Sequence, residues 1–362
     1  MASGESRIET IDSMRGLAAL AVCWFHFTQA NGIVDEGALK SSGKYGWLGV
    51  EVFFVISGFI IPYALHRGGY ELKKFHIFLA KRLTRLDPPY IVSILLMLAV
   101  GFALTFAPHY EGQPFHVNPV ALLLHLGYVN VFFGYDWLNP VYWTLAIEFQ
   151  YYLLIGLTFP LVGSRARWKR LIFFATLGLL AWKITYGAYI FHFIFLFFMG
   201  IALFQRRAGI IGRAELLALL ALFVCGNYLL LGISFTVAGL AAVCGIAFLT
   251  LRNRALTFLG AISYSLYLIH PPVTKVVYTL GRRFATGGVE KTALVFIALM
   301  GSILSAYLLY LIVERPSQRW SSSFRYRRRA VAEDYGGGMD SSGRSDLGEL
   351  ASPLAPVGDE GG

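Results

Sequence analysis

The chain has 362 residues, of which 56% are hydrophobic and only 14% are charged. In a soluble domain about a quarter of the residues are charged, so the composition excludes an ordinary soluble enzyme and favours a polytopic membrane protein. The net charge of +10 does not indicate nucleic-acid binding, because most basic residues flank apolar stretches, as they do in membrane proteins. The 3 cysteines have neither disulfide nor metal-binding spacing, so we expect no metal site.

Apolar stretches follow one another along the chain, most of them close to the length that a helix needs to cross a bilayer. They cover residues 14–31, 46–66, 89–107, 120–134, 141–163, 171–186, 188–205, 214–231, 232–251, 257–278 and 291–313. The fourth is short and contains His125 and Asn130, which is typical of a re-entrant or interfacial segment. We therefore predict an all-α membrane protein with about ten transmembrane helices and one segment that does not cross.

The positions of the basic clusters support this topology. Basic clusters lie at residues 73–85, 164–170, 205–213, 252–254 and 325–329. If residues 120–134 do not cross, all five clusters fall on the side of the amino terminus, and only Arg282 and Arg283 fall on the other side. We therefore expect both termini in the cytoplasm and the protein in the cell membrane, the inner one where there are two. Residues 1–320 are predicted to form the membrane-embedded domain. Residues 321–362 are predicted to form a basic juxtamembrane run, held to anionic lipid, and a disordered tail.

The first stretch contains two ionisable residues, Arg15 and His26. They lie eleven residues apart, almost three helical turns, so they share one face and are separated by roughly 16 Å along the axis. Ionisable groups inside a membrane are costly and usually face a cavity that serves function. His26 is therefore a candidate general base, and a purely structural role is the alternative.

Glu148 lies in the fifth stretch, at a depth similar to that of His26 in the first. A contact between the two side chains would orient the imidazole and strengthen it as a base. A buried ion pair that only holds two helices together is the alternative. Glu148 is thus a candidate catalytic residue, and binding of the acceptor is its other candidate role.

Three further polar residues lie in apolar stretches. Glu51 is either a cavity residue or an interfacial carboxylate hydrated from outside. Ser57 precedes Gly58 in mid-span, where small residues usually indicate close helix packing, and a substrate contact is the less favoured alternative. His270 precedes two prolines, so we expect the helix to break or kink there and to present this side chain either to a cavity or to protein packing.

Arg82 and Arg85 stand three residues apart and therefore share a helix face. Guanidinium groups bind phosphate oxygens through two hydrogen bonds, so this pair could hold a phosphorylated cytosolic ligand. Arginines at the cytoplasmic end of a helix also satisfy the topology rule without any ligand. On spacing alone, the second interpretation is favoured.

Together these motifs resemble acyltransferase family 3 of the integral membrane acyltransferases, which includes bacterial O-antigen and exopolysaccharide O-acetyltransferases. The resemblance covers residues 8–320. It depends on six motifs in order, IDSMRGLAALAVCWFHF, GVEVFFVISGFII, FLAKRLTRLDPPY, VYWTLAIEFQYYLL, LGAISYSLYLIHPP and ERPSQRW. Each motif alone is weak, but six in register are specific.

The resemblance implies transfer of an acyl group, by family frequency acetyl, from cytosolic acyl-CoA to a hydroxyl of a carbohydrate or glycolipid acceptor. It implies that His26 is catalytic, either deprotonating the hydroxyl or carrying the acyl group itself. It also implies that Arg15, Arg82 and Arg85 bind the coenzyme, which is a co-substrate rather than a tightly bound cofactor. The candidate substrate contacts are Glu51, Ser57, Trp143, Tyr264 and His270.

Two other classes of protein are compatible with some of these features. A secondary transporter also uses buried His and Glu side chains as a proton relay, and it often contains broken helices. Against it, the spacing of spans and charges shows no internal repeat, and a basic inner mouth suits a polyanion. An inactive membrane scaffold is the second of these alternatives.

Overall fold

The computed structural model describes residues 4–29, 32–107, 115–251 and 253–324, and within these ranges the chain is helical, with no β-strand. The long helices are α1 (Gly4–Thr28), α3 (Gly49–Arg67), α4 (Phe75–Leu104), α6 (Tyr142–Val162), α7 (Arg167–Lys183), α8 (Ile194–Arg207), α9 (Arg213–Leu231), α10 (Ile233–Phe248), α12 (Ser263–Gly281) and α13 (Gly288–Leu309). The short ones are α2 (Ala38–Gly43), α5 (Pro119–Leu126), α11 (Arg254–Ala261) and α14 (Arg315–Ser323), and a π-helical turn (Tyr310–Glu314) joins α13 to α14. The all-α prediction is confirmed.

Six helical segments in the described part of the chain are long and apolar enough to cross a membrane. They are Ala38–Arg67, Leu72–Leu104, Tyr142–Val162, Ile190–Arg207, Arg213–Leu231 and Gly288–Ser323. Other apolar stretches form shorter helices, such as α7 with 17 residues and α10 with 16. Ten crossings and cytoplasmic termini stay predictions, and the tail beyond residue 324 lies outside the described residues.

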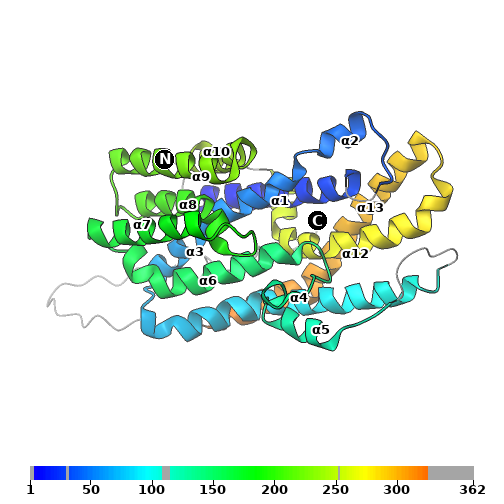
Figure 1. Cartoon of the computed structure of the whole chain (residues 1–362), viewed down its shortest axis with the longest axis horizontal. Helices are drawn as coiled ribbons and strands as arrows, with labels where there is room; N and C mark the ends of the chain where they lie inside the picture. Colours follow the sequence, from blue (N-terminus) through cyan, green and yellow to red (C-terminus); the bar gives the residue numbers. More distant parts are fainter. Residues whose placement is uncertain (1–3, 30–31, 108–114, 252, 325–362) are drawn as a thin grey trace, which may run out of the picture.

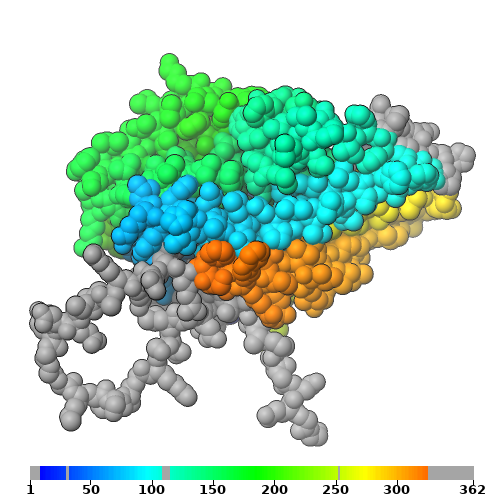
Figure 2. Space-filling view, turned by 90° about the horizontal axis from the view of Figure 1, so that it is seen from below, coloured from blue at the N-terminus to red at the C-terminus, as the bar shows by residue number. Residues whose placement is uncertain are grey.

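The helices form two groups, and α1 and α3 lie between them (Figure 1). Helices α7 to α10 gather on the left of the view, α12 and α13 lie on the right, and α4 and α6 run along the lower edge. A large apolar core joins α3, α6 and α8, and a smaller one lies between α1, α12 and α13. Seen from below, α4 and α14 lie side by side (Figure 2), and Ser321 Oγ donates to the Lys81 carbonyl at 2.7 Å. Helix α1 contributes buried residues to both cores and therefore connects them.

Helices α3 and α8 pack against each other with almost no space between their backbones. A Cβ atom added at Gly58 would lie 2.3 Å from the Phe197 carbonyl oxygen, and one added at Gly200 would lie 2.1 Å from that of Val55. Only glycine permits such an approach, which is the usual function of small residues between membrane helices. The close packing predicted at Gly58 is confirmed.

The segment 120–134 forms no long helix. Its helix α5 has eight residues and is thus about 12 Å long, which is too short to cross a bilayer. The buried His125 ring holds this segment in place, because Nδ1 lies 2.7 Å from the Ala121 carbonyl and Nε2 accepts from Leu138 N–H at 3.0 Å. The prediction that this segment is interfacial or re-entrant agrees with its length.

The break expected before Pro271 is not found, because α12 continues through both prolines. Pro272 has no N–H and therefore leaves the carbonyl of Leu268 without its helical partner. The Asn139 side chain, from the segment before α6, donates to this carbonyl at 3.3 Å. The helical interruption lies instead at Ile262, between α11 and α12. A residue distant in sequence thus compensates for the proline.

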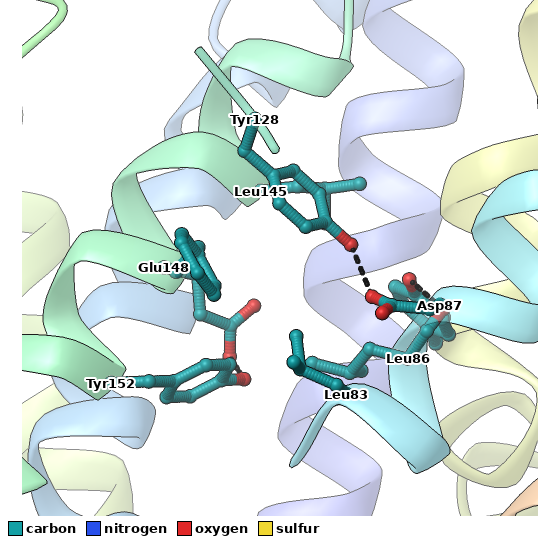
Figure 3. A pocket seen from close by; sticks show the side chains of 9 residues that line it. Leu83, Leu86, Asp87, Tyr128, Leu145, Glu148 and Tyr152 are labelled. Carbon is teal, nitrogen blue, oxygen red and sulfur yellow. Dashed lines mark hydrogen bonds between the residues drawn. The ribbon is translucent and has the colours of Figure 1, made fainter. Parts of the chain in front are cut away.

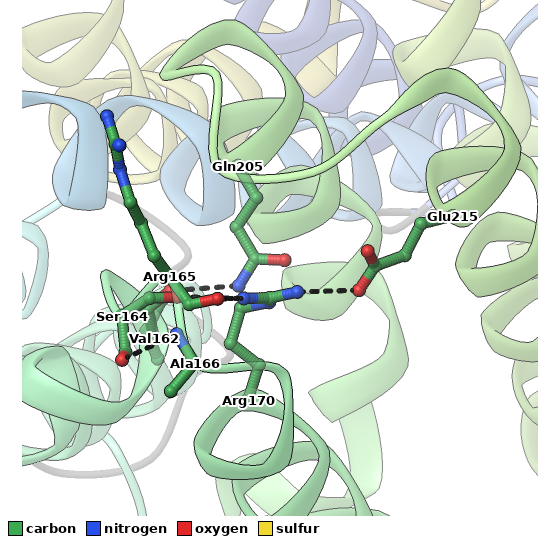
Figure 4. Close-up of polar contacts among 7 residues, drawn as sticks. All are labelled: Val162, Ser164, Arg165, Ala166, Arg170, Gln205 and Glu215. Carbon is green, nitrogen blue, oxygen red and sulfur yellow. Dashed lines mark hydrogen bonds and ion pairs between the residues drawn. The ribbon is translucent and has the colours of Figure 1, made fainter.

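A buried arginine joins the loop after α6 to the start of α9 (Figure 4). Arg170 is 3% exposed, and it donates to the carbonyls of Ser164 and Arg165 at 2.9 and 2.8 Å and pairs with Glu215 at 2.7 Å. Beside it, Gln205 Nε2 donates at 2.9 Å to a carbonyl in the last turn of α6. This network ties four helices together, and it explains Arg170 as a structural residue.

Candidate active site

The three arginines assigned to donor binding lie together. Arg85 on α4 is within electrostatic range of Arg82 on the same helix and of Arg15 on α1. Arg15 also pairs with Asp12 one turn earlier on α1, at 3.8 Å. Helices α1 and α4 thus bring these three cations to one place, as a site for a polyanion requires. The charges repel one another unless carboxylates or a ligand compensate them.

A second carboxylate beside these arginines is Glu314, the last residue of the π-helical turn. It is 2% exposed and accepts hydrogen bonds from the Ser265 amide at 3.2 Å, the Ser265 hydroxyl at 2.5 Å and Gln318 at 2.9 Å. It is within electrostatic range of Arg85 and Arg15. Two carboxylates, Asp12 and Glu314, therefore face three guanidinium groups, which leaves positive charge for an anionic ligand.

Arg82 connects the arginine cluster to Glu148. Its guanidinium lies 5.6 Å from the ring centres of both Phe78 and Tyr152, within cation–π range. Its buried Nε atom has no hydrogen-bond partner. The Tyr152 hydroxyl donates to Glu148 Oε1 at 2.5 Å, and the Ser57 hydroxyl donates to the same oxygen at 3.2 Å. Three helices, α3, α4 and α6, thus meet at the Glu148 carboxylate.

A pocket lies beside this carboxylate (Figure 3). It is lined by Leu83, Leu86, Asp87, Tyr128, Leu145, Glu148, Phe149, Tyr152 and Tyr264. The Tyr128 hydroxyl points at Asp87 and donates to it at 2.9 Å, and Tyr264 donates to the Leu86 carbonyl at 2.9 Å. The open space is about 10 Å³, close to what one water molecule requires. A sugar therefore enters only if these side chains move apart.

The His26 ring faces another histidine. Its centre lies 5.1 Å from that of His270 on α12, with the two planes at 47°. His270 is 0% exposed, and Phe27 packs edge-on against it at 6.2 Å. Glu148 accepts from Ser57 and Tyr152, as described above. A catalytic contact between His26 and Glu148 stays a prediction.

Two other predicted site residues have different surroundings. Glu51 lies in the first turn of α3, is 1% exposed and has one carboxyl oxygen, Oε2, without a hydrogen-bond partner. Because Glu51 is buried, it does not have the environment of an interfacial carboxylate hydrated from outside, which was the alternative. Trp143 packs its ring 5.6 Å from that of Phe193 in the large core and does not line the pocket.

Tyr152, Asp12, Glu314 and Tyr128 also lie at this site and were not expected there. Tyr152 follows Glu148 by four residues, which places both on one helix face, so this spacing could have identified it. Asp12 and Glu314 lie inside the quoted motifs but were given no role. Tyr128 comes from the segment after α5, and no local pattern indicates that its hydroxyl reaches Asp87.

The family assignment follows from comparison with known proteins. A family model described as an acyltransferase domain, that of acyltransferase family 3, matches residues 8–311. The chain belongs to this family. The match includes the helices that carry His26, the three arginines, Glu148 and His270.

Curated relatives in the family are similar over part of the chain. O-acetyltransferase OatA of Staphylococcus aureus is 30% identical over 172 residues, 45% of this chain and 26% of that protein. Peptidoglycan O-acetyltransferase OatA of Listeria monocytogenes is 29% identical over 162 residues, 41% of this chain and 23% of that protein. A putative acetyltransferase of Acidianus two-tailed virus is 28% identical over 180 residues, 50% of this chain and 48% of that protein. The matches thus span between a quarter and a half of these relatives. No solved structure matches the chain.

Proposed function

We propose that this protein is a membrane-bound O-acyltransferase that moves an acetyl group from cytosolic acetyl-CoA to a hydroxyl of a surface carbohydrate. The family supports acyl transfer, and the relatives named O-acetyltransferases, one of them acting on peptidoglycan, support acetyl and a carbohydrate acceptor. The inner membrane is the expected location. The observation that carries the proposal is that Arg15, in the cationic cluster, and His26 lie on one continuous helix, α1, eleven residues apart.

The separation suits coenzyme A. Its phosphates and its thioester lie at opposite ends of a long, flexible arm, so a site for it needs anion-binding groups far from the reacting group. Arg15 and His26 are both on α1, eleven residues and therefore roughly 16 Å apart along the axis. Arg82 and Arg85 add two guanidinium groups at the Arg15 end. The phosphates would bind there, and the thioester would reach His26.

His26 would act as the general base. Its imidazole takes the proton of the acceptor hydroxyl while the hydroxyl oxygen attacks the thioester carbonyl carbon. The tetrahedral intermediate then collapses, the carbon–sulfur bond breaks, and the imidazolium returns the proton to the departing thiolate. In the other route that we left open, the His26 nitrogen itself attacks the thioester and carries the acetyl group to the hydroxyl. Both routes need this ring at the thioester.

Glu148 and its neighbours would bind the acceptor. The Glu148 carboxylate, with three tyrosine phenols and a second carboxylate, Asp87, in the same pocket, is suited to accept hydrogen bonds from sugar hydroxyls. Aromatic rings in the same pocket offer apolar faces for a sugar ring. Orientation of His26 by Glu148 is the alternative role.

The decisive experiment is acetyl transfer in membranes supplied with labelled acetyl-CoA and soluble peptidoglycan fragments. We expect His26→Ala to lose at least 100-fold in transfer rate at unchanged expression and insertion, since a general base contributes about 10²–10⁴. His192→Ala is the matched control, because this half-buried histidine lies in the turn before α8, outside the site. Full activity of His26→Ala would refute the proposal.

The donor site has its own test. Arg82→Ala combined with Arg85→Ala should raise the KM for acetyl-CoA at least tenfold and weaken the binding of CoA, because two cationic partners of the phosphates are lost. Arg207→Ala is the control, an exposed arginine at the end of α8. An unchanged KM would mean that these arginines serve membrane topology only.

A further inference from the structure

We propose that His270 is the positioning residue of the catalytic histidine, and that its Nε2 atom accepts a hydrogen bond from the His26 ring. This inference rests on the proposed function and adds a second histidine to it. The two rings come from α1 and α12, which pack against each other, and their centres lie 5.1 Å apart. The rings are tilted by 47° and Nε2 has no hydrogen-bond partner in this structure, so the proposed bond forms when the His26 ring turns toward it.

The protonation of the His270 ring follows from its surroundings. Nδ1 lies 3.0 Å from the carbonyl of Leu266, one turn earlier on α12. A carbonyl oxygen only accepts hydrogen bonds, so Nδ1 carries the proton and the neutral ring has its lone pair on Nε2. The hydroxyl of Thr274 donates to the His270 carbonyl at 2.6 Å and fixes the backbone on the other side. The ring is therefore held as an acceptor, and its rotation is restricted.

The hydrogen bonds of Nδ1 and of the backbone carbonyl leave one polar atom of His270, Nε2, to be explained. The side chain is 0% exposed, and Nε2 has no hydrogen-bond partner. A buried acceptor without a partner is unfavourable and rare in folded proteins, so it indicates a partner that arrives in another state. The ring centres of Phe27 and Tyr267 lie 6.2 and 6.0 Å from that of His270, farther than the ring centre of His26.

The proposed bond would set the chemistry of His26. If one His26 nitrogen donates to His270 Nε2, the other nitrogen is unprotonated and is available to the acceptor hydroxyl. When His26 takes the proton, the resulting imidazolium still donates to His270 Nε2, and this bond stabilises the positive charge on His26. No carboxylate has to be buried in the apolar helix interface for this purpose. In other hydrolases and transferases a carboxylate commonly orients the base. Here a neutral histidine would do so.

Two substitutions separate this role from packing. The amide of glutamine reaches the place of the histidine Nε2 atom, so His270→Gln retains an acceptor for His26. The amide of asparagine reaches only the place of Nδ1, so His270→Asn retains the bond to Leu266 and loses the acceptor. His192→Gln is the matched control, at the half-buried histidine in the turn before α8. The readouts are kcat and KM with acetyl-CoA and peptidoglycan fragments, the binding of CoA, and the yield of folded protein.

We expect His270→Asn to lower kcat about 100-fold with unchanged KM and CoA binding, and His270→Gln to retain activity within about tenfold of the wild type. In the His26→Ala background, His270→Asn should cause no further loss, because the positioned group is already absent. Equal activity of both variants, or loss of folded protein in both, would overturn the inference while leaving the proposed function intact. Full activity of His26→Ala would overturn both.

Discussion

The Ser57 hydroxyl on α3 lies 3.2 Å from Glu148 Oε1 on α6. The Tyr152 hydroxyl binds the same oxygen at 2.5 Å. The other oxygen of Glu148, Oε2, is therefore the one that remains for a ligand, and the two hydrogen bonds to Oε1 fix the orientation of the carboxylate. This arrangement leads to the first prediction.

Tyr152→Phe should lower kcat about tenfold or more, because it removes a hydrogen bond to a charged group, worth about 1.5–3 kcal/mol. Ser57→Ala should have a smaller effect, since its bond to Glu148 is longer. Initial rates of acetyl transfer at saturating acetyl-CoA measure both. Tyr128→Phe is the comparison within the pocket, because it removes a hydroxyl that binds Asp87 instead. Wild-type kcat in Tyr152→Phe would rule out a functional role for the Glu148 carboxylate geometry.

Gly58→Ala should destabilise the protein by 3 kcal/mol or more, at or above the upper end of the usual range of about 1–3 kcal/mol for overpacking. The added methyl group would lie 2.3 Å from a backbone oxygen of α8, which cannot move without the whole helix. Gly212→Ala is the control, because an added Cβ there meets nothing within 4 Å. Thermal unfolding in detergent checks the prediction, and equal melting temperatures for the two variants would contradict it.

The stability of the segment around α5 should fall in acid. Burial lowers the pKa of His125 below its ordinary value of 6.5. The folded protein therefore resists protonation, whereas the unfolded chain binds a proton once the pH falls below about 6.5, so stability is full above that pH and is lost below it. His125→Gln should reduce this pH dependence. Melting temperatures at pH 8.0 and 5.5 measure it, and an identical decrease in both proteins would assign the effect to other groups.

Arg170→Met should cost about 3–5 kcal/mol, since it leaves two backbone carbonyls and a carboxylate without their buried partner. Glu215→Gln should cost less, because its side chain is 24% exposed and water can replace the bond. The free energy of unfolding of each single variant and of the double variant gives the coupling between the two residues. Independent, additive effects would show that the pair contributes little.

Hydropathy and helix geometry predicted much of the fold, because both depend on local sequence. The stretch 141–163 became α6, Tyr142–Val162, and the suspect stretch 120–134 became a short helix and a turn. Arg82 and Arg85 were expected on one helix face, and they lie together with Arg15. The lengths of these helices and the shared face of Arg82 and Arg85 are decided by residues within a few helical turns, whereas the approach of Arg15 is not.

The other features of the fold and of the site depend on contacts between residues that are far apart in the sequence. Depth along a helix does not fix which way a side chain points around the axis, so it did not indicate that the His26 ring lies 5.1 Å from that of His270, and the predicted contact with Glu148 stays a prediction. The prolines of α12 were expected to break or kink the helix, but α12 continues through them, and Asn139, more than a hundred residues away, donates to the carbonyl of Leu268 that Pro272 leaves without a helical partner. Neither partner could be read from local sequence.

The π-helical turn between α13 and α14 has a consequence for insertions and deletions. A π-helical turn is a regular helix with one residue added. Deleting one residue from Tyr310–Glu314 would therefore restore regular α-helix and leave the later side chains on their present faces, so Ser321 would still reach Lys81. The same deletion inside α14 would rotate every later side chain by about 100°, so this turn is the place where the segment between α13 and α14 tolerates the loss of a residue.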